Sequence, residues 1–284
     1  MRTNNNLNIL PFYDSLEEQN HKKSYAYNSI YTLIAEDSKL LPFQINRPHL
    51  GLPVNKLLLW NLDTGTSVNI LSEATASGLN VKQFAGEGYD LIISPSLLIF
   101  PTLVMQPGQY YLELGDTDKT WYSEVFTVVT NLSQFLKIEY SDNAAIQYTG
   151  GHIDYSDQYR NFLYVQSEIG KPDYNFEEEA QKRDGYTFIE KQISEKKYKF
   201  EFLAPEFLCD ALRIVRMHDF IKIYYQGKTY DVENIIFEPK WKEQGDLAIM
   251  EVEFECDTII KKIGRGYVPG STDFNNDFNN DYKL

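Results

Sequence analysis

The stretch 196-KKYKFEFL-203 alternates charged and apolar residues. Successive side chains of a strand point to opposite faces, so this pattern predicts a strand with one aromatic and one charged face. The aromatic face carries Tyr198, Phe200 and Phe202. A second stretch, 246-DLAIMEVEFECD-257, repeats the alternation with glutamates opposite an apolar face. Each strand therefore has one face to bury and one to expose.

The second half of the chain is expected to be an antiparallel sheet with one helix, and these two strands can share that sheet. Pairing would bring Lys197 and Lys199 onto the same outer face as the glutamates of the second strand. Those glutamates are Glu251, Glu253 and Glu255. Directly opposite charges contribute roughly 0.2–1 kcal/mol per pair, so they select the register rather than create the fold.

The residues between the strands predict a helix over 205–217, within 205-PEFLCDALRIVRMHD-219. Pro205 suits a first helical position, and Glu206 suits the positive end of the helix dipole. Apolar residues form one stripe along this helix, which would cover the apolar faces of the strands. By contrast, the polar segment 170-GKPDYNFEEEAQKRDG-185 is expected to be a loop with at most one helical turn.

Upstream, short apolar runs are separated by Gly, Pro, Asp and Asn, as in "NKLLLWNL", "YDLIIS", "GQYYLELG" and "YSEVFTVV". Regularly spaced short strands of this kind predict a β-sandwich or a barrel, and the sandwich is the preferred interpretation. The expected fold is mainly β, with an N-terminal β-sandwich followed by an α+β module that has an antiparallel sheet and one main helix. The expected division is an N-terminal arm over 1–24, the β-sandwich over 25–131, the α+β domain over 132–263 and a flexible C-terminal tail over 264–284.

Bulk composition excludes several classes of function. The chain has 284 residues and a net charge of −14. Nucleic acids and anionic membranes both require clustered Lys and Arg, so neither is an expected partner. No window approaches 18 apolar residues, and "MRTNNNLNILPFYD" is not a signal peptide, so we expect synthesis in a cytoplasm and no membrane insertion. Cys209 and Cys256 are too few for a disulfide framework and are predicted to be small buried side chains.

The motif 62-LDTGTSV-68 resembles the active-site loop of aspartic proteases, in which two aspartates share one proton. Asp63 would need a second carboxylate, and the sequence has no second Asp-Thr-Gly or Asp-Ser-Gly. The preferred interpretation is a turn in which Gly65 supplies a positive φ.

Other polar clusters also have ordinary structural explanations. Asp116 and Asp118 have the spacing of a calcium loop, but the later Gly and Glu of an EF-hand are missing, so a hairpin loop is expected. The run 177–179 is a solvated acidic face. Gly86 and Gly88 do not lead from a strand into a helix, as a phosphate loop would. The remaining candidates are the scattered histidines, none of which has helical metal-site spacing: His21, His49, His152 and His218. We therefore expect no catalytic residue, no metal and no cofactor.

Several segments of the chain resemble a known group of proteins. They are "EKQISEKKYKFEFLAPEFLCDALR", "GKTYDV", "PKWKEQGDLAIMEVEFE", "GQYYLELGDTDKTWYSEVFTVV" and the closing "FNNDFNND". In these segments, which span most of residues 100–284, the chain resembles tail, ring or baseplate virion proteins of tailed phages of Bacteroidetes, including crAss-like phages. The resemblance implies a non-enzymatic structural subunit located in the virion tail. It brings no catalytic residue.

The implied partners are further copies of the chain in a ring and other tail or portal-vertex proteins. The C-terminal stretch 272-TDFNNDFNNDYKL-284 is the candidate docking strap, whose aromatics would enter pockets on a neighbouring subunit. Its six docking residues recur with a period of four: Asp273, Phe274, Asp277, Phe278, Asp281 and Tyr282. A segment without fixed structure is the alternative for this tail.

A different function, a β-sandwich that binds glycans or a receptor on the virion surface, is the alternative for the whole chain. It depends on aromatic side chains that could stack on sugar rings. These are Trp60, Tyr110, Tyr111 and Trp121. Core packing explains the same four residues equally well.

Overall fold

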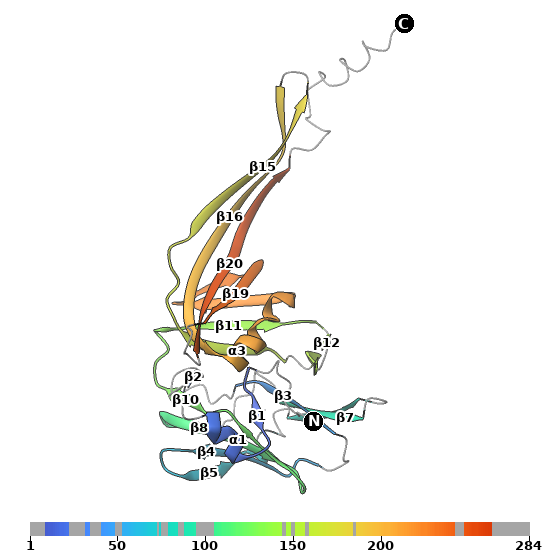
Figure 1. The fold of residues 1–284 in the computed structure, drawn as a ribbon, viewed down its shortest axis with the longest axis vertical. Coiled ribbons are helices and arrows are strands. Elements are labelled where there is room, and N and C mark those ends of the chain that lie inside the picture. The colour runs from blue at the N-terminus through green and yellow to red at the C-terminus, as the bar shows by residue number, and fades with distance from the viewer. Residues whose placement is uncertain are drawn as a thin grey trace. The chain divides into compact units, whose positions relative to one another are not determined.

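A computed structural model describes residues 9–22, 32–34, 41–48, 53–72, 74, 79–84, 88–94, 105–143, 146–148, 151–156, 159–183, 186–241 and 247–262. The fold is mainly β, with several antiparallel sheets and one main helix, as predicted (Figure 1). Contacts group the chain into two compact units. Unit 1 comprises residues 1–173 and 197–256, and unit 2 comprises residues 174–196 and 257–284. Among the described residues, no helix is long and apolar enough to cross a membrane.

The largest sheet of unit 1 has seven strands, in the order β1-β9-β8-β10-β2, with β4 beside β8 and β5 beside β4. The strands are β1 (Phe12–Tyr13), β2 (Thr32–Ile34), β4 (Lys56–Asn61), β5 (Thr66–Asn69), β8 (Gly108–Gly115), β9 (Thr120–Ser123) and β10 (Phe126–Val129). The pairing of β10 with β2 is parallel, whereas β8 pairs antiparallel with each of its neighbours. Leu112 and Leu114 of β8 are fully buried, which makes this strand the centre of the sheet.

The N-terminal residues join this sheet, which differs from the predicted arm. Ile9 and Leu10 are at most 1% exposed, and β1 pairs with β9 at the edge of the sheet. Tyr13 donates a hydrogen bond to Glu124 at 2.8 Å. Helix α1 (Leu16–Lys22) follows. The hydroxyl of Ser15 caps it by accepting a hydrogen bond from the amide of Glu18 at 3.1 Å. The apolar residues between the Asn-rich flanks are thus enough to form one edge strand and to bury part of it.

A three-stranded sheet, in the order β3-β7-β6, also belongs to unit 1. Its strands are β3 (Phe43–Pro48), β6 (Asn80–Phe84) and β7 (Tyr89–Ser94). Arg47 of β3 lies 3.3 Å from Asp90 of β7 and 2.6 Å from Asp116, the residue after β8. All three side chains are at most 1% exposed. This buried ion cluster connects the three-stranded sheet to the seven-stranded sheet.

A four-stranded sheet has the order β14-β11-β17-β18. Its strands are β11 (Phe135–Ser141), β14 (Asn161–Gln166), β17 (Phe220–Tyr225) and β18 (Lys228–Asp231). Leu136, Ile138 and Ile223 are buried on its apolar face. Polar and aromatic side chains alternate with them on the other face, where the pocket described below begins. A separate two-stranded sheet joins β12 (Ile146–Tyr148) to β13 (Gly151–Ile153).

The predicted pair of alternating strands is confirmed. The last sheet has the order β15-β16-β20-β19, with β15 (Asp173–Arg183), β16 (Tyr186–Pro205), β19 (Asn234–Lys240) and β20 (Leu247–Lys262). In unit 1 its aromatic face is buried, and the predicted charge pairs form on the other face. Lys197 lies 2.7 Å from Glu255, and Lys199 lies 2.9 Å from Glu253.

The main helix is shorter than the predicted 205–217. It is α3 (Glu206–Leu212), followed after two residues by the 3₁₀ turn η3 (Val215–Met217). Pro205 has an extended backbone and is the N-cap residue, directly before the first helical residue, and it makes no side-chain capping hydrogen bond. Leu208, Ala211 and Leu212 are buried, as the apolar stripe predicted. Cys256 is buried as predicted, whereas Cys209 at the helix is half-buried.

The loop predicted over 170–185 is wrong, because most of it forms strand β15. The strand lies at one edge of its sheet. Edge strands tolerate charged side chains, since only one side of the backbone is paired. The acidic run 177–179 therefore marks an edge strand, not a loop, and Tyr174 and Phe176 supply the β-forming residues.

Candidate functional site

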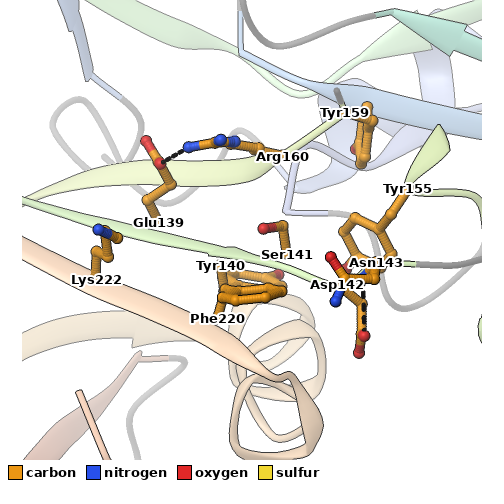
Figure 2. A pocket seen from close by; sticks show the side chains of 10 residues that line it. All are labelled: Glu139, Tyr140, Ser141, Asp142, Asn143, Tyr155, Tyr159, Arg160, Phe220 and Lys222. Atoms are coloured by element: carbon orange, nitrogen blue, oxygen red, sulfur yellow. Dashed lines mark hydrogen bonds and ion pairs between the residues drawn. The ribbon is translucent and has the colours of Figure 1, made fainter. Parts of the chain in front are cut away.

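A pocket of about 300 Å³ opens in unit 1 at the end of β11 and the start of β17 (Figure 2). This volume is at the lower end for ligand sites, which run from about 300 to 1,000 Å³. The end of β11 and the loop after it supply half of the lining, and the remainder comes from the segment before β14 and from β17. The lining residues are Glu139, Tyr140, Ser141, Asp142, Asn143, Tyr155, Tyr159, Arg160, Phe220 and Lys222.

A buried network of hydrogen bonds adjoins the pocket through two of its lining residues, Tyr155 and Tyr159. Nδ1 of His218 lies 2.9 Å from the carbonyl oxygen of Ile214. Nδ1 therefore carries a proton and donates a hydrogen bond to this oxygen. Nε2 of His218 then accepts from the hydroxyl of Tyr155. Asn161 donates to the same hydroxyl at 3.1 Å and accepts from Tyr159 at 2.8 Å. Both ring nitrogens of His218 therefore take part in this network, one as a hydrogen-bond donor and one as an acceptor, so the imidazole is held neutral in one tautomer.

The electrostatics agree with a structural role for this network. Burial lowers the pKa of His218, and two backbone hydrogen bonds oppose that shift only in part. Burial also raises the pKa of Tyr159 well above its usual value. Both shifts favour the uncharged form of the side chain, which agrees with the neutral tautomer that the hydrogen bonds of His218 indicate.

Glu139 lies at the charged side of the pocket and is ion-paired. Its carboxylate is 3.0 Å from Arg160 and also contacts Lys137 (the Arg160 pair is drawn in Figure 2). Burial by itself would raise the pKa of Glu139, but hydrogen bonds from Lys137 and Arg160 outweigh it and lower the pKa. Glu139 therefore remains ionised and neutralised, which suits holding two cations in place better than transferring a proton.

The rim of the pocket carries a pair of neighbouring carboxyl groups. A hydrogen bond with Asp142 raises the pKa of Asp219, and the charge of Asp142 adds to the shift. Phe220 beside them is 46% exposed. The rim thus combines an accessible ring with two neighbouring carboxyl groups. Such a set can bind a small polar group, whereas catalysis would also need a positioned nucleophile or substrate clamp.

One contact elsewhere in unit 1 resembles a nucleophile beside a base. The hydroxyl of Ser156 contacts the ammonium of Lys82, which lies 3.0 Å from Asp154. Burial would raise the pKa of Asp154, but hydrogen bonds from Ser156 and Lys82 outweigh it and lower the pKa. Lys82 donates to the serine hydroxyl and pairs with Asp154, so in this arrangement it does not act as a base that accepts the serine proton.

Asp63 lies in the predicted turn, between β4 and β5. Asn61 accepts hydrogen bonds from the amides of Asp63 and Thr64 at 2.9 and 3.1 Å, and Gly65 has a φ of 68°. The carboxylate of Asp63 accepts from the amide of Gln109 at 3.0 Å, so it holds the start of β8 against the turn. The turn interpretation is confirmed.

Asp116 lies in the expected hairpin loop. One carboxylate oxygen accepts from the amides of Asp118 and Lys119, both at 2.8 Å, and the other pairs with Arg47. Both oxygens are thus committed to protein groups. Within the described ranges, no group of three or more His, Cys, Asp or Glu side chains is placed to hold a metal ion. His218 does not line the pocket itself, but it hydrogen-bonds to Tyr155, which does.

Most of the aromatics named for glycan stacking lie inside the protein. Trp121, Tyr110 and Tyr111 are 1%, 5% and 7% exposed. Trp60 is half-buried, stacks on Tyr111 and donates to Glu113 at 2.6 Å. These residues are therefore core and sheet-packing groups. The six tail residues, Asp273, Phe274, Asp277, Phe278, Asp281 and Tyr282, lie outside the described residues.

Unit 2 supplies a surface that the sequence did not reveal. Its described part is a three-stranded ribbon made from β15, β16 and the last residues of β20, and none of the described side chains in it is buried. Tyr174, Phe176, Ile259 and Ile260 are 74%, 59%, 69% and 53% exposed. A small sheet needs a covered apolar face to be stable, so large exposed apolar side chains on this ribbon are candidates for contact with a partner. Recognising the strand alternation through Tyr174 and Phe176 would have revealed this ribbon.

Comparison of the chain with protein-family models, with curated proteins and with solved structures finds no match.

Proposed function

We propose that the chain is a non-enzymatic structural subunit of a bacteriophage tail, tail hub or baseplate ring, where it joins neighbouring virion proteins. It is made in the bacterial cytoplasm and resides in the virion. The sequence resemblance to phage tail, ring and baseplate proteins supports the virion, and the ribbon of unit 2 supports assembly. The observation that carries the proposal is that this ribbon has no buried side chain among its described residues.

The physical reason is the cost of leaving such a ribbon uncovered. Burying a side chain of the size of Phe or Ile contributes roughly 1.5–3 kcal/mol. Tyr174, Phe176, Ile259 and Ile260 are all more than half exposed, so a partner that covered them would stabilise the ribbon. Ring assembly supplies such a partner for every copy.

The polar groups of unit 1 also support a structural role. Arg160 and Glu139 line the pocket as an ion pair, and Asp63 and Asp116 hold loops in place. We further infer that the seven-stranded and three-stranded sheets are the two layers of the predicted β-sandwich, with Arg47 as a connection between them.

Purified particles of the phage that encodes the chain test this proposal. Quantitative peptide mass spectrometry should find the chain in a whole-number ratio to the other tail proteins. A reconstruction of the tail should contain repeated density that fits unit 1. Particles from which the chain is absent would contradict the proposal, as would turnover of a substrate in the pocket by the purified protein.

A further inference from the structure

The ribbon of unit 2 has two outer edges. Strand β15 ends the sheet on one side. On the other side, β19 pairs with β20 only as far as Glu255. In the described part of the chain, residues 259–262 of β20 therefore border only β16. A strand edge is a template for pairing with another chain, unless charge or cover prevents it.

Side-chain contacts define how β15 lies beside β16. Asn175 donates to Glu195 at 3.2 Å, and Gln192 donates to Glu178 at 2.6 Å. From the first contact to the second, β15 advances by three residues, from 175 to 178, and β16 goes back by three, from 195 to 192. The two strands are therefore antiparallel and keep one register between these contacts. Position 176 therefore lies beside position 194.

Strand β20 is placed beside β16 in the same way. Lys196 lies 3.7 Å from Asp257, and the pairs formed by Lys197 and Lys199 show that β20 runs antiparallel to β16. Asp257 has a φ of 56°, which is typical of an extra residue in a strand. Counting onward from Asp257 places Ile259 beside position 194.

The result is a set of straight rows across the ribbon, with side chains on one face. One row contains Phe176, Ser194 and Ile259, and the next contains Glu178, Gln192 and Lys261. In each row, the residue at the β15 edge complements the residue at the β20 edge. The first row ends in an aromatic and an aliphatic side chain, and the second ends in an acid and a base.

We propose that the ribbons of successive copies join edge to edge, with residues 259–261 of β20 in one copy pairing in parallel with residues 176–178 of β15 in the next. This inference rests on the ring assembly proposed above and names its interface. In it, Ile259 packs against Phe176, and Lys261 pairs with Glu178, whose carboxylate also accepts from Gln192. The partner is a second copy of this chain.

The geometry suits a closed ring. Copies related by rotation about an axis along the strands all point the same way, so β20 meets the next β15 in parallel. The complementary residues of each row lie at the same height, so adding a copy needs no shift along the axis. A head-to-tail interface without such a shift closes into a ring instead of winding into a filament.

Charge reversal tests the pairing in the full-length chain. Glu178→Lys and Lys261→Glu should each abolish rings at protein concentrations where the wild type forms them, as seen by native mass and negative-stain microscopy. An equal mixture of the two variants should form rings again. In the mixture, the lysine introduced into β15 of one variant meets the glutamate introduced into β20 of the other, and the remaining interface keeps its original charges. Restored rings should therefore contain even numbers of copies.

Matched controls keep the outcome specific. Lys182→Glu changes a charge on β15 beyond the paired rows, and Glu168→Lys changes an exposed acid of unit 1; both should form rings like the wild type. Thermal unfolding of every variant should match the wild type. Rings from both single variants alone would overturn the pairing and leave ring assembly standing. The double variant Glu178→Lys/Lys261→Glu reverses both charges in one chain and can close a ring of any number of copies. Loss of rings in both single variants, without rescue in the mixture or in the double variant, would also overturn the pairing. A wild-type chain that stays monomeric would instead contradict the proposed function.

Discussion

Tyr198 of β16 and Phe254 of β20 stack with ring centroids 5.3 Å apart and planes inclined by 17°. Both rings are buried, at 8% and 0% exposure. The charge pair between Lys199 and Glu253 forms on the opposite face of the same strands at 2.9 Å. One register therefore satisfies both faces, and a slip of one residue would expose the rings and bury the charges.

Truncation of this stack should weaken unit 1 strongly. Phe254→Ala should lower the free energy of unfolding by about 3–5 kcal/mol, the usual cost of removing a buried aromatic ring. Glu251→Ala, on the exposed face of the same strand, should change it by less than about 0.5 kcal/mol. Urea unfolding followed by tryptophan fluorescence measures both. Equal effects of the two substitutions would show that the stack is not part of the core.

The buried arginine gives a second prediction about unit 1. Arg47→Ala removes the cation between Asp90 and Asp116, so that two buried carboxylates lose their common positive charge. The expected loss is about 3–5 kcal/mol of unfolding free energy. Arg213→Ala is the matched control, because Arg213 is exposed and pairs only loosely with Asp210 at 3.7 Å; its cost should stay below about 1 kcal/mol. Similar unfolding midpoints for the two variants would contradict the claim that the buried ion cluster stabilises unit 1.

His218 predicts a pH dependence at mildly acidic pH. Burial lowers its pKa in the folded protein, so below about pH 6.5 the unfolded state binds a proton that the folded state does not. Stability should therefore fall as the pH drops below about 6.5, with a slope of at most about 1.4 kcal/mol per pH unit from this group. Carboxylates with lowered pKa, such as Glu139, act only at lower pH.

The variant His218→Gln isolates this contribution. It should be less stable than the wild type at pH 7, because Tyr155 and Ile214 lose a hydrogen-bond partner. Between about pH 6.5 and 5.5, its stability should depend less on pH than that of the wild type. Parallel stability curves for the two proteins over this range would show that His218 is not buried neutral.

The C-terminal tail remains a prediction from the sequence. A chain that ends at Lys262 should unfold at nearly the same temperature as the full chain and form fewer rings. Three aromatics entering pockets would each contribute roughly 1.5–3 kcal/mol, against an ordering cost of roughly 1–2 kcal/mol per residue. The net gain per copy is small and becomes important when a ring repeats it.

A triple variant separates the tail aromatics from the length of the tail. Alanine at positions 274, 278 and 282 should weaken rings as truncation does, and raised salt should weaken the wild type if the tail aspartates pair with partner cations. Rings that form equally well from the truncated chain would remove any role for the tail in assembly.

Much of the fold could be predicted from the local alternation of apolar and charged residues. The strands around Tyr198 and Phe254, their charge pairs and the helix between them follow from periodicity that is visible in single segments. The turn at Asp63 and the hairpin at Asp116 follow in the same way from turn chemistry.

Features that depend on distant partners were not visible. The acidic run in β15 indicates a loop until its pairing with β16 is known, because charge is tolerated at a sheet edge. The hydrogen bond beside the pocket joins Tyr155 to His218 across 63 positions, and Arg47 reaches Asp116 across 69. Nothing in a local window indicates either contact. The alternation of Tyr174 and Phe176 could have indicated strand β15, but the exposure of the ribbon follows only from the structure.

The central claim, that this chain assembles into rings, is tested most directly by negative-stain class averages of the purified full-length protein over a range of concentrations. The account predicts closed rings with one defined number of copies, whose population rises with concentration. Particles that remain single copies at every concentration, with no higher mass in native mass spectrometry, would contradict it.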